Sequence, residues 1–135
     1  MDINKRAQRA VEKKMIYGLN CCQAVALELQ DQTDLDEITI KNLASGFAVG
    51  MGNMQATCGA LIGANMIAGL SAEGSGAVRN AKAISDEFKN LCGATICKDL
   101  KGVETGKVLC PCNDCVKNAV IAYGKVMGLK NKVLD

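Results

Sequence analysis

No charged side chain occurs between Asn42 and Ala72, and this run constrains the fold more than any other feature of the chain. Such a stretch has to be buried, either in a protein core or in a membrane. The polar residues Asn53 and Gln55 interrupt it, and its later apolar part, CGALIGANMIAGL, is too short to cross about 30 Å of hydrocarbon. We therefore expect a central core helix here and no membrane insertion. The small residues of this helix recur at intervals of four, which would let another backbone or a compact cofactor come close: Gly59, Ala60, Gly63, Ala64 and Ala68.

Apolar residues elsewhere recur at the three- and four-residue spacing of amphipathic helices, and no segment shows the sustained alternation of a strand. We expect Ala7, Ala10, Val11 and Met15 on the buried face of a first helix over about residues 4–17, and Asn20 as the N-cap of a helix that begins at Cys21. A chain of 135 residues has the size of one domain. The sequence thus predicts a single all-α domain over residues 1–135, a compact bundle of five or six helices around the Gly/Ala-rich central helix. The further helical segments are expected at residues 40–50, 77–91, 95–102 and 113–129.

Charge and composition exclude several classes of protein. A net charge of +2 and an aromatic content of 3% provide neither the basic stripe nor the stacking side chains of a nucleic-acid-binding surface. The N-terminal stretch lacks the apolar core of a signal peptide, so we expect a cytoplasmic protein. The low aromatic content also suggests a thin core, and a homodimer would bury additional apolar helix faces.

Eight cysteines and no histidine determine what chemistry the chain can perform. In the reducing cytosol a cysteine-rich domain is more often a metal binder or a redox protein than a disulfide scaffold. We expect Cys22 and Cys92 to be core thiols, and Cys58, at the start of the central helix, to have a lowered pKa. The cluster of Cys110, Cys112 and Cys115 could hold three metal ligands, although its single C-x-x-C has no strand before it and no second knuckle. The cysteines at or near helix starts or tight turns are Cys21, Cys58, Cys97 and Cys112.

Four segments in this order resemble the family of redox-active proteins named for the pattern C_GCAxxG_C_C. They are LNCCQAVALEL, the Gly-rich GFAVGMGNMQATCGALIGANMIAGL, CKDLKG and the tail CNDCVKNAVI. The resemblance implies a site formed by Cys21, Cys58, Cys97 and Cys112. In the tail it selects Cys112 through Val116 and Ala119, and a shift of a few residues would select Cys110 or Cys115 instead. A related four-cysteine domain occurs joined to multihaem sequences, but this chain has no C-x-x-C-H and therefore no c-type haem of its own.

Four thiolates without histidine suit an iron–sulfur cluster, either [2Fe–2S] or [4Fe–4S]. The favoured function is accordingly electron transfer or redox sensing, with Cys21, Cys58, Cys97 and Cys112 as the metal ligands and a redox protein as partner. Two alternatives stay open. In a thiol–disulfide protein without metal, Cys58 or Cys112 would be the attacking thiol. In a metal-binding protein the same thiolates would take zinc or copper.

Overall fold

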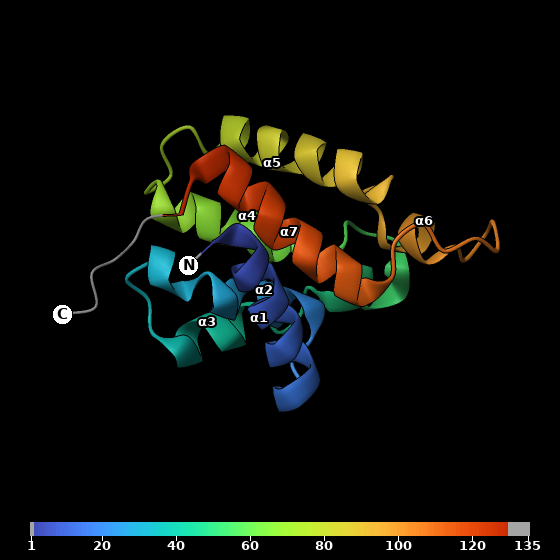
Figure 1. The fold of residues 1–135 in the computed structure, drawn as a ribbon, viewed down its shortest axis with the longest axis horizontal. Coiled ribbons are helices and arrows are strands. Elements are labelled where there is room, and N and C mark those ends of the chain that lie inside the picture. The colour runs from blue at the N-terminus through green and yellow to red at the C-terminus, as the bar shows by residue number, and fades with distance from the viewer. Residues whose placement is uncertain (1, 130–135) are drawn as a thin grey trace.

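The computed structural model describes residues 2–129 and confirms the all-α fold (Figure 1). Six of its α-helices have at least seven residues, which agrees with the expected five or six, and a short helix, α6, adds one turn. Within the described residues, β-structure is limited to one bridge between Thr57 and Ile96. The α-helices are α1 (Ile3–Tyr17), α2 (Cys21–Glu28), α3 (Glu37–Leu43), α4 (Gly59–Ser71), α5 (Ala77–Cys92), α6 (Cys97–Lys101) and α7 (Cys112–Met127). A 3-10 turn lies at Gln30–Gln32 and a π-helical turn at Gly50–Met54.

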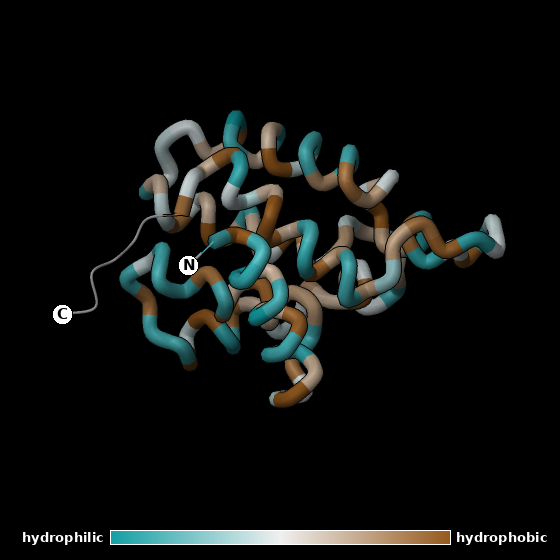
Figure 2. The backbone as a smooth tube through the Cα atoms, in the orientation of Figure 1, coloured by the Kyte–Doolittle hydropathy of each residue, from teal (hydrophilic) through white to brown (hydrophobic). Residues whose placement is uncertain are grey.

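The central helix α4 contains the apolar end of the charge-free run and packs against α2, α5 and α7. Helix α1 packs against α2 and α7. Helix α7 therefore contacts α1 as well as α2, α4 and α5. Hydrophobic and hydrophilic residues alternate along the turns of α5 at the edge of the molecule in Figure 2, as expected for a helix with one buried face. No helix within residues 2–129 is both long and apolar enough to cross a membrane.

Local signals determine where the first two helices start. Asp2 accepts a hydrogen bond from the Lys5 amide at the start of α1, and Gly18 ends this helix in the left-handed conformation. Asn20 forms a full capping box with Gln23, as the sequence predicts, and thereby fixes Cys21 as the first residue of α2. These caps position one cysteine side chain at a defined helix start.

A buried ion pair holds α1 on α2. The Arg6 guanidinium donates to the Glu28 carboxylate at 2.5 Å, to the Glu28 carbonyl at 2.6 Å and to Asp31 at 2.6 Å. Lys13 donates to the second Glu28 oxygen at 2.5 Å, so the buried carboxylate is neutralised from both sides. Breaking such a pair leaves an uncompensated buried charge, which makes Arg6 and Glu28 a fixed point of the α1–α2 contact.

Two expectations about the early part of the chain are wrong. Helix α3 ends at Leu43 instead of continuing to Gly50, because the chain turns and then enters a left-handed segment with φ of 55° at Val49 and 65° at Met51. Met15, expected on the buried face of α1, is 65% exposed, because it lies in the last turn of that helix, where its sulfur meets the Asn113 amide at the start of α7 at 3.7 Å and no core side chain of the described residues covers the rest.

The close packing of α4 against α2 yields a stability test at Gly63. A methyl group there would lie 2.8 Å from the Cys22 carbonyl oxygen and 3.3 Å from the Val25 Cβ. We expect Gly63→Ala to destabilise the protein by about 1–3 kcal/mol, the usual cost of overpacking a core. Urea denaturation of the metal-free protein measures the effect.

Gly69 provides a control in the same helix, because nothing lies within 4 Å of a methyl group at that position. Gly69→Ala should be neutral or stabilising by up to about 1 kcal/mol, since alanine is the better helix former. Equal destabilisation by both substitutions would contradict the close α2–α4 approach.

Candidate functional site

The isolated β-bridge places two of the predicted site residues side by side. The Cys58 amide donates to the Thr95 carbonyl at 2.8 Å, and the Cys97 amide donates to the Ala56 carbonyl at 3.0 Å. Cys58 is the N-cap of α4, and Cys97 is the first residue of α6. The bridge therefore brings two helix starts, and their thiols, to the same place.

All four cysteines that the family resemblance selects line one cavity of about 320 Å³. Cys21 and Cys112 are the first residues of α2 and α7, so each thiol comes from the start of a different helix. All eight cysteines of the chain are free thiols. The structure thus brings together Cys21, Cys58, Cys97 and Cys112 at one site. The other lining residues are Lys14, Asn20, Ala48, Val49, Met54, Gly59 and Lys101.

Two glycines allow the backbone to approach these thiols. A methyl group on Gly59 would lie 2.8 Å from the Cys21 sulfur and 2.8 Å from the Phe47 carbonyl oxygen. A methyl group on Gly50 would lie 2.7 Å from the Cys97 Cβ, and Gly50 has a φ of +54°. Any side chain at either position would push a cysteine away from the cavity. The small-residue pattern of the central helix therefore admits a cysteine as well as a neighbouring helix.

Cys112 is the activated thiol of the cavity. A hydrogen bond from the Cys21 thiol lowers the pKa of Cys112 to about 6. Burial raises this pKa, but the positive charges of Lys101 and Lys14 lower it further, so the net effect is a lowered pKa. Cys21 shows the reverse, because the hydrogen bond to Cys112 and burial raise its pKa and keep it protonated. The pair is poised as a thiolate with a thiol donor beside it.

The expected low pKa of Cys58 is wrong. The hydrogen bond with Cys115, together with burial, raises the pKa of Cys58. The backbone N–H groups of Ala60 and Leu61 at the start of α4 act in the opposite direction, as the sequence suggests, but they are outweighed. Sequence reasoning placed Cys58 correctly at a helix start and missed the second thiol that faces it.

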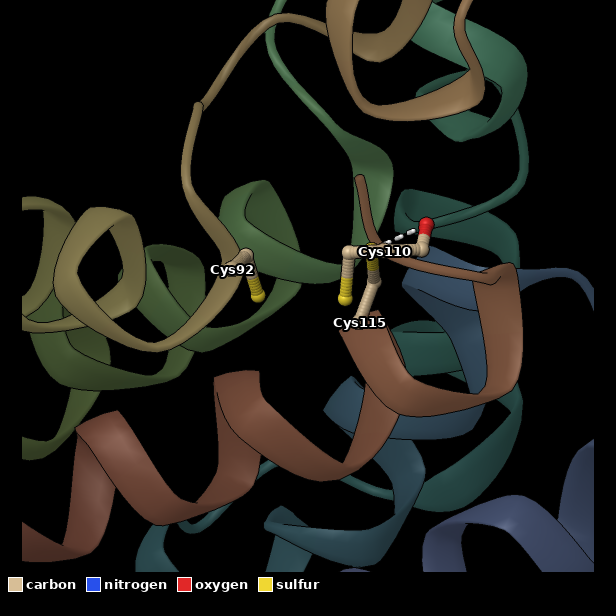
Figure 3. A group of neighbouring side chains, drawn as sticks. All are labelled: Cys92, Cys110 and Cys115. Carbon is tan, nitrogen blue, oxygen red and sulfur yellow. Dashed lines mark hydrogen bonds between the residues drawn. The ribbon is translucent and has the colours of Figure 1, made fainter. Parts of the chain in front are cut away.

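A second group of cysteines lies outside the cavity lining and was expected from the sequence only in part. The sulfurs of Cys92, Cys110 and Cys115 lie within 4.8 Å of one another, all three residues are buried, and they could hold a metal ion (Figure 3). The sequence predicts a cluster of Cys110, Cys112 and Cys115. In the structure Cys92, from the end of α5, takes the place of Cys112, which lines the cavity instead. Only the crowding of cysteines before α7 signals this group in the sequence.

Cys22 is a core thiol, as expected. It is fully buried, its sulfur lies 3.9 Å from that of Met66, and burial raises its pKa to about 12. Cys92 is buried as well, but its sulfur faces two other thiols, so the expectation of simple packing describes it incompletely.

Comparison with known proteins supports the resemblance seen in the sequence. A family model described as "Putative redox-active protein (C_GCAxxG_C_C)" matches residues 19–126. The chain belongs to the C_GCAxxG_C_C family. The matched range contains all eight cysteines, and hence both groups of thiols. No curated protein and no solved structure matches the chain.

The Cys21–Cys112 pair predicts how the reduced, metal-free protein reacts with iodoacetamide. Because only the thiolate is alkylated, the rate at Cys112 should rise through about pH 6 and level off above about pH 7, whereas an ordinary thiol continues to rise toward pH 8–9. Peptide mass spectrometry after timed quenching measures the rate at each cysteine.

Cys21→Ala is the matched variant, since it removes the thiol that donates to Cys112. In this variant the pH midpoint of the alkylation rate at Cys112 should move upward, toward the pKa range of an ordinary thiol. A midpoint above about pH 8 in the unmodified protein would refute the assignment of Cys112 as the activated thiol.

Proposed function

We propose that Cys21, Cys58, Cys97 and Cys112 bind an iron–sulfur cluster and that the protein serves electron transfer or redox sensing. The observation that carries this proposal is the convergence of four thiols, one from each of four helix starts, on a single cavity. Iron–sulfur clusters are held by four cysteine thiolates, and the sequence contains no histidine that could compete for the metal.

The surroundings of the four sulfurs fit such a group. The backbone N–H of Val49 acts to lower the pKa of Cys21, and the N–H groups of Ala60 and Leu61 act to lower that of Cys58. Hydrogen bonds to ligand sulfurs stabilise the thiolate form and tune a cluster's potential. Lys14 and Lys101 line the same cavity and offset part of the negative charge that four thiolates bring together. When bound, a cluster would supply one-electron chemistry.

The protein's own contribution is to collect, orient and shield the sulfurs. Cys21, Cys58 and Cys97 are buried, whereas Cys112 is only partly buried. Because the ligands come from residues far apart in the sequence, the site exists only in the folded chain, so metal binding would also stabilise the fold. Val49 lines the cavity and is 53% exposed, which offers a redox partner protein an apolar approach to the site.

The alternative function is thiol–disulfide exchange, and the Cys21–Cys112 pair is the observation that favours it. The Cys112 thiolate would attack one sulfur of a disulfide in a partner protein. This step would form a mixed disulfide between Cys112 and the partner and release the other partner sulfur as a thiolate. Cys21 would then lose its proton and attack the Cys112 sulfur. This step would form a Cys21–Cys112 disulfide and release the second partner thiol, so that the partner is reduced and this chain is oxidised.

One experiment separates these functions: visible absorption together with iron, sulfide and zinc analysis of protein purified without oxygen. The proposal predicts iron and acid-labile sulfide in comparable amounts, with broad visible absorbance. Zinc without sulfide would indicate the alternative in which the same thiolates bind zinc or copper. A metal-free protein that reduces disulfides would indicate the exchange reaction. Either of the last two results would overturn the iron–sulfur proposal.

Substitution of single cysteines tests which thiols hold the cluster. We expect Cys58→Ser or Cys97→Ser to abolish visible absorbance, because three thiolates leave the metal incompletely bound. The double variant should lose no more than either single variant, since the second change meets a site that is already broken. Iron analysis and the visible spectrum are the measurements.

Cys22→Ser is the control, because Cys22 is buried against Met66 and does not line the cavity. It should leave the spectrum nearly unchanged, and so should Cys92→Ser. Loss of the spectrum in Cys22→Ser with the fold intact would argue against the four-ligand assignment. Cys110→Ser and Cys115→Ser should likewise be tolerated if Cys112 is the fourth ligand.

A further inference from the structure

The group of Cys92, Cys110 and Cys115 is distinct from the cavity cysteines, because none of the three lines the cavity. The two groups touch where Cys115 faces Cys58. The three thiols come from the end of α5, from the loop before α7 and from the first turn of α7. Figure 3 shows the side chains directed into the same space between these segments. Residues that are distant in the sequence are thus brought together by the packing of α5 on α7.

The spacing of the sulfurs fits one small metal ion with three ligands. Metal–sulfur bonds of about 2.3 Å in a trigonal plane require sulfurs about 4 Å apart. The three sulfurs lie within 4.8 Å of one another, so small side-chain adjustments suffice to close the site. All three are free thiols.

Two polar side chains direct hydrogen-bond donors at the sulfurs of this group. The Asn118 amide donates to the Cys92 sulfur at 3.3 Å and contacts the Cys110 sulfur at 3.9 Å. The Lys101 ammonium lies 3.7 Å from the Cys115 sulfur and donates to the Cys110 carbonyl at 3.2 Å. A cation and an amide donor directed at sulfur are the outer-shell partners that metal thiolates use.

The number and softness of the ligands decide the class of metal. Zinc in a structural site takes four ligands, and a zinc site with three protein ligands keeps a position for water. Here the group contains three cysteines and no carboxylate, the sequence has no histidine, and the three cysteines are at most 4% exposed, so bulk solvent does not reach the sulfurs. Soft thiolates in low coordination number suit a monovalent soft cation.

We propose that Cys92, Cys110 and Cys115 form a second metal site that binds one Cu(I) ion through three thiolates, independently of the four-cysteine cavity. Binding releases the three thiol protons to solvent and changes no oxidation state. The resulting centre carries a net charge of −2, and the Lys101 ammonium beside Cys115 offsets part of it. Asn118 orients the Cys92 sulfur and acts as a positioning residue.

The test is titration of the reduced, metal-free chain with Cu(I) under competition with a Cu(I) chelator, without oxygen. The cavity thiols are first disabled in a Cys21→Ser/Cys97→Ser background, so that copper in the cavity is not counted. We expect this background to bind one Cu(I), and X-ray absorption to report three sulfur ligands at about 2.3 Å. Adding Cys92→Ser should weaken binding by more than about 100-fold, beyond the 10–100-fold typical of an outer-shell loss, and Asn118→Leu should weaken it by about tenfold.

Cys22→Ser in the same background is the control and should bind Cu(I) unchanged, because Cys22 belongs to neither group. A background variant that is folded by circular dichroism and binds no Cu(I), or binds it equally well after Cys92→Ser, would overturn the inference. If the site binds zinc as tightly as Cu(I) when both ions compete for it, the choice of Cu(I) would be overturned. If the Cys21→Ser/Cys97→Ser background does not fold, the number of Cu(I) ions bound per chain is compared between the unmodified protein and the single variant Cys92→Ser. The unmodified protein should bind one Cu(I) more, and equal numbers would contradict the site. Loss of this site leaves the iron content of the cavity as a separate measurement, so the two proposals fail independently.

Discussion

The contact on which the site depends is the single antiparallel bridge between Thr57 and Ile96. Its two flanking hydrogen bonds, from the Cys58 and Cys97 amides, hold the start of α4 against the start of α6. Within residues 2–129 no other β-structure exists, so these bonds alone place the two cysteines next to each other by backbone pairing. The left-handed turn at Val49 and Gly50 then wraps over Cys97, and Gly59 admits the Cys21 sulfur. Strained backbone of this kind persists where the surrounding structure requires it, which is typical of functional sites.

The thiols form two groups that meet at one contact. Cys58 hydrogen-bonds with Cys115, and Cys115 belongs to the buried group with Cys92 and Cys110. Lys101 serves both, since it lines the cavity and lies 3.7 Å from the Cys115 sulfur. The two groups account for seven of the eight cysteines, and the eighth, Cys22, is a core thiol against Met66. One group lines a cavity, and the other is buried where the end of α5 meets the start of α7.

The sequence predicts the helices well because their end signals are local: the Asn20 capping box and the Gly93 terminus of α5 each involve only a few neighbouring residues. The family resemblance selects the four cysteines that line the cavity, which periodicity alone would not. Three features were missed because they depend on tertiary contacts. The left-handed turn after α3 follows from packing on Cys97, the raised pKa of Cys58 from the facing Cys115, and the second thiol group from the docking of α5 on α7.

The central claim is that the four thiols of the cavity hold one iron–sulfur centre. The most direct measurement is anomalous diffraction at the iron edge, from crystals of the protein reconstituted with iron and sulfide and grown without oxygen. The account predicts iron sites confined to the cavity, with the sulfurs of Cys21, Cys58, Cys97 and Cys112 each bonded to iron at about 2.3 Å, close to other metal–thiolate bonds. Iron bound by Cys92, Cys110 and Cys115 instead, or cavity thiols that remain without iron or pair as disulfides, would contradict it.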